Sequence, residues 1–574
     1  MTTSTRSFSL PLAETTTGDA CANASTVERP DHSADAGPTV YLETFGCQMN
    51  VLDSQLVTGQ LRALGYRFVG DWKSADVVLY NTCSVREVAE NKVWSRIGKY
   101  RKHQQTRIAE GRFPGVLGVI GCMAERDGED LIRKHPQVDV LCGPGELDKV
   151  PMLIDNALKT GFDDRAGLAT AQVALQGNTH RRSGTLAAAE DQLELVDLSR
   201  SLTPAPAPGS DDASAGGRSA YVRITRGCNK LCTYCVVPHT RGAEVHRPPD
   251  HIVDECKRLV DAGVIEITLL GQTVNHYHYD NAAAVEINGV RQPQVGTVIS
   301  PNRGTGGPSP TFNDTTTSFA DLLYRIHEEV PGLRRLRFVT SFPRDFGDDI
   351  LAVIRDCPRI CRYLHLPVQS GSNRVLKLMN RGYRVEQYLD LVDRVREFIP
   401  GAELATDLIC GFPTETDEDH AATADLLRRC RFKNSFIFKY SPRPGTAAIG
   451  RFRDDVPPEV KKKRNNELLA IQGAVSAEIH AGYVGRTVEV FVERVSAKSN
   501  KRSANAVDPS VTLGWRAEQT VTQLSGRTDG DLIVMFDVPP GSAPALIGSV
   551  VQVEIESSAA LALFGRARVA AGVS

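Results

Sequence analysis

The chain has 574 residues, too many for a single hydrophobic core, and this length predicts about three domains. Its charged and hydrophobic fractions, 24% and 41%, are typical of a globular protein, and a formal net charge of -2 excludes capture of nucleic acid by overall charge. No apolar run of about 18 residues and no signal peptide occur, so we expect a cytoplasmic protein without a membrane partner. An odd count of 13 cysteines also favours a reducing compartment over a disulfide framework.

Residues 1–37 are rich in Thr, Ser, Ala, Asp and Pro without apolar periodicity, which predicts a disordered leader. Residues 38–159 then repeat a unit of apolar strand, loop and helix, which predicts a small parallel α/β sheet. The expected strands are 39–44, 75–80, 116–120 and 138–141, and the expected helices are 53–65, 85–107, 129–135 and 150–158. Asp53 is the expected N-cap of the first helix.

A cysteine follows each of the first three predicted strands: Cys47, Cys83 and Cys122. In a parallel α/β sheet, ligands bind beyond the carboxyl ends of the strands, and three equivalent turns bring three side chains to that edge. Any one of these residues alone is well explained as a small buried hydrophobic side chain. Three in register predict a metal site with three thiolates, such as an iron–sulfur cluster with one open iron.

Residues 160–218 have the Ala-, Ser-, Thr-, Gly- and Pro-rich composition of a linker. Residues 219–480 again alternate apolar strands and helices, which predicts a parallel (β/α) barrel or partial barrel with its chemistry on the carboxyl-end loops. The expected strands are 220–224, 265–270, 336–340, 363–366 and 405–410. Residues 280–317 interrupt this pattern as an insertion in a surface loop, with a possible hairpin at Asn288-Gly289.

Three more cysteines, Cys228, Cys232 and Cys235, lie on one loop after the first barrel strand, at a C-x3-C-x2-C spacing. One short loop can direct three thiolates at three irons of a cubane cluster and leave the fourth iron open for an exogenous ligand. The alternatives are a structural zinc site, which normally needs four protein ligands, and buried free thiols.

The last region, residues 481–570, alternates strands and turns and predicts a small β-barrel, with strands expected at 487–492, 532–536 and 550–555. Five basic residues give this region local positive charge: Lys498, Lys501, Arg502, Arg516 and Arg527. A solvated basic face and contact with RNA explain them equally well on charge alone. Small β-barrels are nevertheless a common platform for oligonucleotides.

Four segments carry a resemblance to a known family: GCQMN at 46–50, NTCSVRE at 81–87, GCMAER at 121–126 and GCNKLCTYCVVPHTRG at 227–242. With these motifs the chain resembles the methylthiotransferase family of radical S-adenosylmethionine (SAM) enzymes over about residues 39–568. The resemblance implies an α/β fold in three parts: an N-terminal parallel α/β domain, a central partial (β/α) barrel of radical SAM type and a small C-terminal β-barrel called TRAM, which binds RNA.

The resemblance implies that all six cysteines are catalytic metal ligands of two [4Fe-4S] clusters. The Cys228, Cys232 and Cys235 cluster would cleave SAM to a 5′-deoxyadenosyl radical, and the Cys47, Cys83 and Cys122 cluster would carry the sulfur. The product would be a 2-methylthio group on N6-dimethylallyladenosine beside the tRNA anticodon. The expected SAM contacts are the backbone of Tyr234, the strand-end residues Gln272, Ser341 and Gln369, and Asp407 as a further polar contact.

The family usually has other residues at four positions of this chain: His239 replaces Tyr, His246 replaces Ser, Thr273 replaces Asn and Phe342 replaces His. His365 is expected to be a packed histidine, and Arg443 either pairs with an anion or is structural.

The expected partners are the anticodon loop of tRNA and an electron donor such as flavodoxin or ferredoxin, and we expect a monomer. Two alternatives remain open from the sequence. One is a sister methylthiotransferase acting on threonylcarbamoyladenosine in tRNA. The other is an RNA-binding protein in which the cysteines form structural metal sites.

Overall fold

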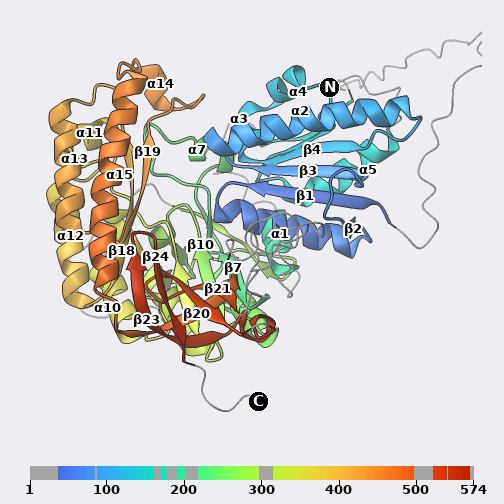
Figure 1. Ribbon diagram of the computed structural model, residues 1–574. Coiled ribbons are helices and arrows are strands. Elements are labelled where there is room, and N and C mark those ends of the chain that lie inside the picture. Colours follow the sequence, from blue (N-terminus) through green and yellow to red (C-terminus); the bar gives the residue numbers. More distant parts are fainter. Residues whose placement is uncertain are drawn as a thin grey trace, which may run out of the picture.

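A computed structural model describes residues 37–84, 87–160, 170–176, 190–200, 217–296, 315–496, 521–539 and 541–568. Figure 1 shows three parts: an N-terminal α/β layer structure, a central barrel flanked by long helices, and a small C-terminal β-barrel below it. The α/β fold with these three parts is therefore confirmed. All but the last residue of the predicted leader lie outside the described residues.

The N-terminal part is a six-stranded sheet in the order β2-β1-β3-β4-β5-β6, with every neighbouring pair parallel. Its strands are β1 Thr39–Phe45, β2 Arg67–Phe68, β3 Val77–Thr82, β4 Val116–Gly121, β5 Val140–Cys142 and β6 Gln172–Ala174. Strands β3 and β4 are buried along their whole length, as their continuous apolar sequences require in a sheet covered on both faces.

Helices cover both faces of this sheet (Figure 1). Helices α1 (Gln48–Ala63) and α5 (Val150–Lys159) pack on one face. Helices α2 (Glu87–Ala109) and α4 (Glu129–Lys134) pack on the other. Helix α1 begins five residues before the predicted start, so Asp53 is not its N-cap. Asp53 lies fully buried inside the helix because arginines of the central barrel pair with its carboxylate.

The segment predicted as a linker contains two packed pieces. Strand β6 extends the N-terminal sheet by pairing with β5, and helix α6 (Gln192–Leu198) lies against the central barrel. Three buried acidic residues of this region, Asp191, Glu194 and Asp197, pair with Arg226, Arg247 and Arg223. Composition alone did not predict this packing, because it depends on charge partners that lie later in the chain.

The central barrel consists of two parallel three-stranded sheets joined by a bridge between Leu336 and Ile360. Its strands are β7 Ser219–Arg223, β10 Glu266–Leu270, β16 Arg335–Phe338, β17 Tyr363–His365, β18 Glu403–Cys410 and β19 Asn434–Lys439. The helices that cover it include α8 Pro249–Asp261, α9 Phe319–Glu329, α10 Asp348–Asp356, α12 Val385–Phe398, α13 Asp417–Cys430 and α15 Pro458–Ala481. The sequence analysis did not predict β19.

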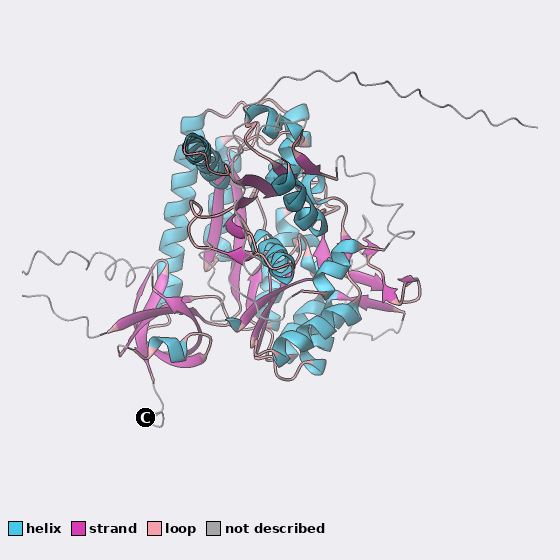
Figure 2. Cartoon of the chain, turned by 90° about the vertical axis from the view of Figure 1, so that its right-hand side faces the viewer, coloured by secondary structure: helices cyan, strands magenta, loops and turns pink. Residues whose placement is uncertain are grey.

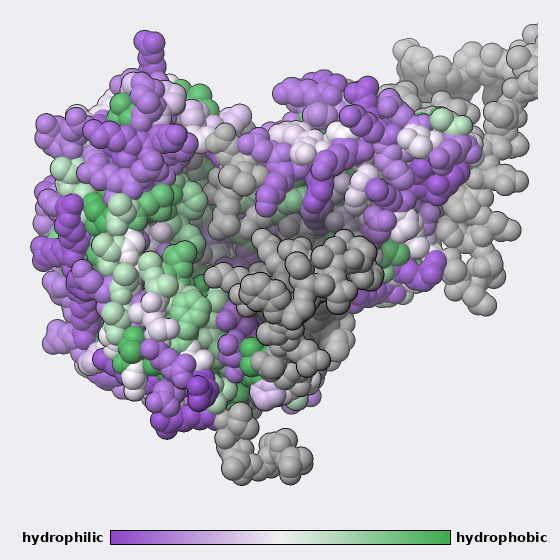
Figure 3. Space-filling view, viewed as in Figure 1, coloured by the Kyte–Doolittle hydropathy of each residue, from purple (hydrophilic) through white to green (hydrophobic). Residues whose placement is uncertain are grey.

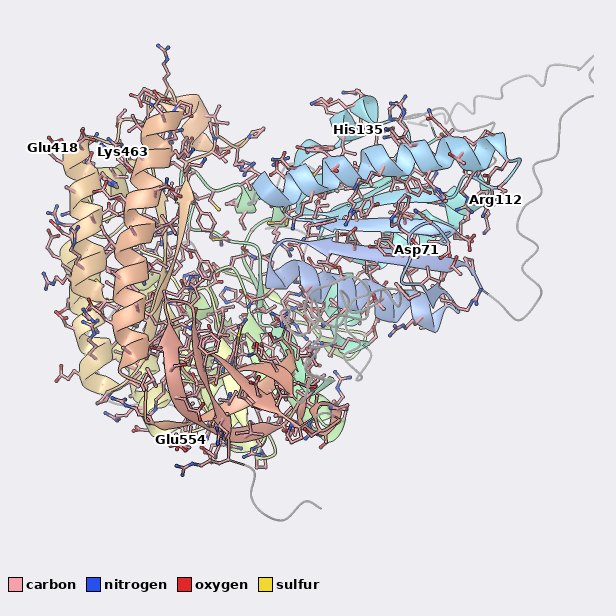
Figure 4. The ribbon with its side chains drawn as sticks, viewed as in Figure 1. Asp71, Arg112, His135, Glu418, Lys463 and Glu554 are labelled. Carbon is pink, nitrogen blue, oxygen red and sulfur yellow. The ribbon has the colours of Figure 1, made fainter. Side chains whose placement is uncertain are left out.

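Glu418, near the start of α13, and Lys463, near the start of α15, lie at one end of the barrel in Figure 4. Helix α13 begins soon after β18 ends, so this is the end to which the carboxyl ends of the strands point. The N-terminal sheet lies beside it (Figure 1). Side chains of both parts therefore meet at the carboxyl edge, where α/β folds place their ligands.

The insertion at 280–317 forms the predicted hairpin: β12 (Glu286–Ile287) pairs antiparallel with β13 (Val290–Arg291), and Asn288 and Gly289 both have positive φ. The residues directly after the hairpin, Gln292 and Pro293, are buried, unlike those of a simple surface loop. The Gln292 side chain bonds to the backbone of Asp191, and β14 (Gln294–Val295) pairs with β9 (Val245–His246). Residues 297–314 lie outside the described residues.

The C-terminal part is a closed barrel in the order β20-β21-β22-β24-β23. Its strands are β20 Thr487–Val495, β21 Thr522–Arg527, β22 Ile533–Val538, β23 Val550–Ala559 and β24 Ala562–Ala567. In Figure 2 it is a separate lobe at the end of a long helix. Of the five basic residues named from the sequence, four lie outside the described residues, and Arg527 is paired with Asp531 and Glu493. Among the described helices, none is long and apolar enough to cross a membrane.

Candidate functional site

The three N-terminal cysteines occupy equivalent places beyond their strands. Cys47 directly precedes α1, Cys83 follows β3, and Cys122 begins α3 (Cys122–Asp127) directly after β4. Gly46 has φ +136°, and a Cβ atom built on it would lie 2.3 Å from Cβ of Cys83. The first two loops therefore approach so closely that only glycine fits between them.

These thiols interact with one another, as the predicted common site requires. A hydrogen bond with Cys83 lowers the pKa of Cys47 to about 6, and this effect exceeds the opposing effect of burial. Burial raises the pKa of Cys122, and the neighbouring Cys47 raises it further. The structure thus brings Cys47, Cys83 and Cys122 together, although they are far apart in the sequence. Their assignment as iron ligands stays a prediction.

Arg241 connects this thiol set to the central barrel. Its Nε donates to Sγ of Cys122 at 3.2 Å, and its Nη2 donates to Oδ2 of Asp53 at 2.7 Å. Asp53 is completely buried, and Nη1 of Arg223 lies 3.5 Å from its other oxygen. A buried cation beside several sulfur atoms favours the thiolate form, which is the form that binds metal.

The Cys228 loop is held by backbone contacts that need unusual conformations. Gly227 has φ +69°, and a Cβ atom on it would lie 2.1 Å from the carbonyl oxygen of Ala243. The amide of Cys228 donates to the carbonyl of Gly242 at 3.1 Å, so the loop is closed against the segment that follows it. Leu231, between two of the cysteines, has φ +52°. Such strain in a non-glycine residue is typical of functional loops.

The loop's three thiols are partly exposed and lie near one another. Burial raises the pKa of Cys235 to about 12, and Cys232 contributes to this rise. Arg381 donates to Sγ of Cys232 at 3.3 Å and to the hydroxyl of Tyr234 at 3.4 Å. Its guanidinium also lies 4.5 Å from the ring centroid of Phe342, at a cation–π distance. Each thiol set therefore has its own buried arginine.

The sheet β17-β18-β19 presents a mixed polar and aromatic face. His365 Nε2 lies 3.0 Å from Oδ1 of Asp407, so this histidine has a polar partner beyond the packing expected from the sequence. Phe436 is the register partner of Asp407, and Phe438 lies two residues further along the same face. Both phenylalanines are 41% exposed. Figure 3 shows hydrophobic surface on this half of the molecule, whereas the surface over α2 is mostly hydrophilic.

Comparisons with known proteins agree with this geometry. Residues 39–143 match the model described as "Uncharacterized protein family UPF0004", and residues 222–427 match that of the radical SAM superfamily. A protein of Rhodopirellula baltica named tRNA-2-methylthio-N(6)-dimethylallyladenosine synthase is 40% identical over 93% of this chain and 97% of its own. The chain belongs to the methylthiotransferase family of radical SAM enzymes.

Other members of this methylthiotransferase family carry the same name. One from Protochlamydia amoebophila is 37% identical over 80% of this chain and 86% of its own, and one from Aquifex aeolicus is 34% identical over 92% and 97%. A solved structure of the radical SAM methyltransferase TsrM from Kitasatospora setae aligns with a TM-score of 0.42 at 16% identity, covering 70% of this chain and 73% of that one.

Membership of the radical SAM family implies SAM and a [4Fe-4S] cluster. The residues fit a cluster of this kind: three thiols on one loop supply the soft ligands that iron–sulfur clusters take, and Arg381 offsets their negative charge. The second set fits in the same way, with Arg241 as its cation. The roles of these two arginines were not identified from the sequence, because each reaches a cysteine that is distant in the chain, Cys122 for Arg241 and Cys232 for Arg381.

Of the five predicted SAM contacts, Tyr234 lies on the cysteine loop, Gln272, Ser341 and Gln369 follow the carboxyl ends of barrel strands, and Asp407 lies within β18. Ser341 is 3% exposed, and its hydroxyl has no partner among the described residues. Gln369 has φ +77°, and its backbone N–H donates to the backbone carbonyl of Asp407 at 2.9 Å. Gln272 follows β10 and is half-buried. Their contacts with SAM, and that of the Tyr234 backbone, stay predictions.

Arg443 pairs with Glu90 of α2 at 2.9 Å, and Arg126 of α3 pairs with the same carboxylate at 2.8 Å. The expected anion is therefore a carboxylate of the N-terminal part. Cys142 ends β5 but differs from the three predicted ligands: its Sγ donates to the carbonyl of Glu146, and it packs in the core beside α5. It is a natural control for experiments on the other cysteines.

Proposed function

We propose that the protein is a radical SAM methylthiotransferase that adds a 2-methylthio group to N6-dimethylallyladenosine beside the anticodon of tRNA. The relatives' printed names support this substrate, at 34% to 40% identity over most of both chains. The proposal includes two [4Fe-4S] clusters, one on Cys228, Cys232 and Cys235 and one on Cys47, Cys83 and Cys122.

The observation that best supports two cooperating clusters is the contact of Arg241 with Cys122. Helix α7 (Val237–Arg241) leads almost directly from Cys235 to Arg241, which touches the second thiol set. Six residues of mostly helical chain span roughly 9 Å, and an arginine side chain adds roughly 7 Å. The two thiol sets are therefore close enough to act on one substrate held between them.

In this proposal the residues of the chain bind and orient SAM and shield the radical from water. When bound, the loop cluster supplies the electron that cleaves SAM into methionine and a 5′-deoxyadenosyl radical. Strand-end residues such as Gln369 and Ser341 hold SAM at the barrel mouth, and the buried positions of these two side chains limit access of water. Proximity matters here because a radical that is not held close to the adenine C2 hydrogen would abstract hydrogen elsewhere.

The proposed RNA contacts use the surface around the barrel mouth. Phe436 and Phe438 offer exposed apolar area near Asp407, which suits an adenine bearing an apolar dimethylallyl group. The C-terminal β-barrel is the proposed platform for the remaining tRNA, by analogy with other small β-barrels. A cytoplasmic location, a monomeric state and a flavodoxin or ferredoxin as electron donor stay predictions of this proposal.

Metal analysis tests the two clusters. After anaerobic reconstitution we expect about eight irons per chain, and about four in the Cys47→Ala variant. The variant should still cleave SAM, because the loop cluster remains. Cys142→Ala is the matched control: it removes a buried thiol from the end of a sheet strand and should leave all the iron in place. Full iron content in Cys47→Ala would show that the second cluster is wrongly assigned.

Nucleoside analysis tests the substrate. Mass spectrometry of tRNA from a strain lacking the gene should show N6-dimethylallyladenosine without its 2-methylthio group, and the intact gene should restore the modification. Loss of a 2-methylthio group from threonylcarbamoyladenosine instead would assign the sister activity. Unchanged tRNA, together with no deoxyadenosine from reduced protein and SAM, would leave only an RNA-binding role.

A further inference from the structure

A buried cluster of three metal-ligating side chains lies outside both thiol sets. It consists of Glu244 and His246, on either side of the start of β9, and His276, on the short helix after β10. One ligand atom from each lies within 4.8 Å of the others. The three side chains are 0% to 2% exposed, so this is an interior site.

The buried carboxylate of Glu244 requires a positive charge close to it. Nδ1 of His276 lies 2.7 Å from Oε2 of Glu244, and Nε2 of His246 lies 3.7 Å from Oε1. Among the described residues, no lysine or arginine pairs with this carboxylate. An ionised carboxylate in the interior is strongly disfavoured unless a positive charge accompanies it. The positive charge is therefore either a proton on an imidazole or a metal ion.

The backbone of His278 holds the His246 ring with its Nε2 on the side of Glu244. Nδ1 of His246 lies 2.7 Å from the carbonyl oxygen of His278 and also accepts a hydrogen bond from the His278 backbone amide at 2.8 Å. If Nδ1 instead carries the proton, the Nε2 lone pair is free to bind a metal beside Glu244. Ligating histidines commonly donate their other nitrogen to a carbonyl in this way. The 3.7 Å from Nε2 to Oε1 is also too long for a direct hydrogen bond.

An unsatisfied buried atom beside the carboxylate points to a metal ion. Nε2 of His246 lacks a hydrogen-bond partner, although the ring is almost completely buried. Thr273 donates its hydroxyl to Oε1 of Glu244 at 2.7 Å, which fixes the carboxylate as an outer-sphere partner does in metal sites. Tetrahedral zinc ligands lie roughly 3.4 Å apart, and the observed 2.7 Å and 3.7 Å fall on either side of this value.

We propose that Glu244, His246 and His276 bind one divalent transition-metal ion, with zinc best suited to this set of two imidazoles and one carboxylate. Two neutral histidines and a carboxylate form a common protein site for such ions, with water in the remaining position. The sulfur atoms of the cluster loop are not part of this site. The inference is independent of the proposed tRNA substrate.

The ion's place in the fold gives it a structural role. The amide of Glu244 donates to the Asn229 side chain at 3.0 Å, and Asn229 follows Cys228 directly. The side-chain amide of Asn229 in turn donates to the carbonyl of Gly296, which follows β14, the strand that pairs with β9. A metal at Glu244 would therefore fix the segment against which the Cys228 loop closes.

The test uses the full chain with its iron–sulfur clusters reconstituted, so that the six predicted ligand thiols are occupied. The protein is exposed to excess Zn²⁺, passed over a chelating resin and analysed for metals and by zinc-edge X-ray absorption. We expect about one zinc per chain, with nitrogen and oxygen neighbours, imidazole scattering and no sulfur shell. His276→Asn should lower the retained zinc at least about tenfold without changing the iron count.

His103→Asn is the control, since His103 lies on α2 in the N-terminal part and should not affect zinc. Less than about a tenth of an equivalent of zinc in the wild type would overturn the proposal. So would a sulfur shell, or unchanged zinc in a folded His276→Asn variant. If that variant does not fold, the wild-type absorption spectrum decides the question by itself.

Discussion

Arg241 Nε donates a hydrogen bond to Sγ of Cys122 at 3.2 Å, although the two residues are 119 positions apart. The same guanidinium pairs with the buried carboxylate of Asp53 at 2.7 Å. Arg241 thus contacts the predicted cluster ligand Cys122 and also helix α1, which directly follows the predicted ligand Cys47. Arg241, on the helix that follows the Cys228 loop, therefore couples this loop to the N-terminal part.

We expect Arg241→Gln to destabilise the contact between the N-terminal sheet and the barrel by about 3 kcal/mol, because it leaves the Asp53 carboxylate buried without its closest cation. The iron bound after reconstitution should also fall from about eight per chain toward four, since the second thiol set loses its cation. Urea unfolding and iron analysis measure the two effects.

The double variant Asp53→Asn with Arg241→Gln removes the charge at both ends and is the control. It should recover most of the lost stability, because two neutral amides can bond to each other, but not the lost iron. Equal losses of stability in the single and double variants would mean that the ion pair is not the cause.

The cysteine sites were predictable because their signal is local. A cysteine lies just after the carboxyl end of each of three parallel strands: Cys47, Cys83 and Cys122. Parallel topology alone brings such positions together at one edge of the sheet. Their cations were not predictable, because Arg241 reaches Cys122 only through the folded interface. The same holds for Asp53, which has the residue type of an N-cap but is buried as an ion-pair partner. Helix α6 was missed because its acidic residues neutralise arginines of the barrel, a pairing that composition does not reveal.

We expect Gly227→Ala to disrupt the Cys228 loop. Gly227 has φ +69°, and the added Cβ would lie 2.1 Å from the Ala243 carbonyl oxygen, so the backbone has to move. Iron should fall by about four per chain, and SAM cleavage should be lost. Gly111→Ala is the matched control, because Gly111 also has φ +69° but no atom within 4 Å of its added Cβ. The control should cost only about 1 kcal/mol of stability and retain all its iron.

We expect Phe436→Ala to weaken the reaction without affecting either cluster. Phe436 is 41% exposed and shares a face with Asp407, so it is available to an apolar substrate group. Loss of such a contact lowers kcat/KM by about 10- to 100-fold. Activity should be measured on tRNA bearing dimethylallyladenosine, with iron content as the check on folding. Leu561→Ala, a change at a 77% exposed side chain in the C-terminal barrel, should have little effect. Equal activity of the two variants would remove Phe436 from the substrate site.

The C-terminal β-barrel is attached to the central barrel through a buried ion pair between Lys433 and Asp531, 2.8 Å apart. Burial alone would raise the pKa of Asp531, but Lys433 and Arg527 outweigh it and lower this pKa to about 2 from an ordinary value of 3.8. A carboxyl group whose pKa is lowered by folding stabilises the folded state at pH values above its pKa in the unfolded chain. Here the stabilisation is about 2 kcal/mol. This stabilisation is lost as the pH falls from about 4 through about 2.

Asp531→Asn should therefore lower the stability of the attached barrel by about 2 kcal/mol at pH 7, and the difference from wild type should shrink as the pH falls below about 4. Urea unfolding of the metal-free chains over this range measures the difference without interference from acid-labile clusters. Asp537→Asn, at an exposed position on β22, is the control and should change stability by less than about 0.5 kcal/mol. A difference between Asp531→Asn and wild type that stays constant from pH 7 to pH 2 would show that the carboxylate charge does not hold the two barrels together.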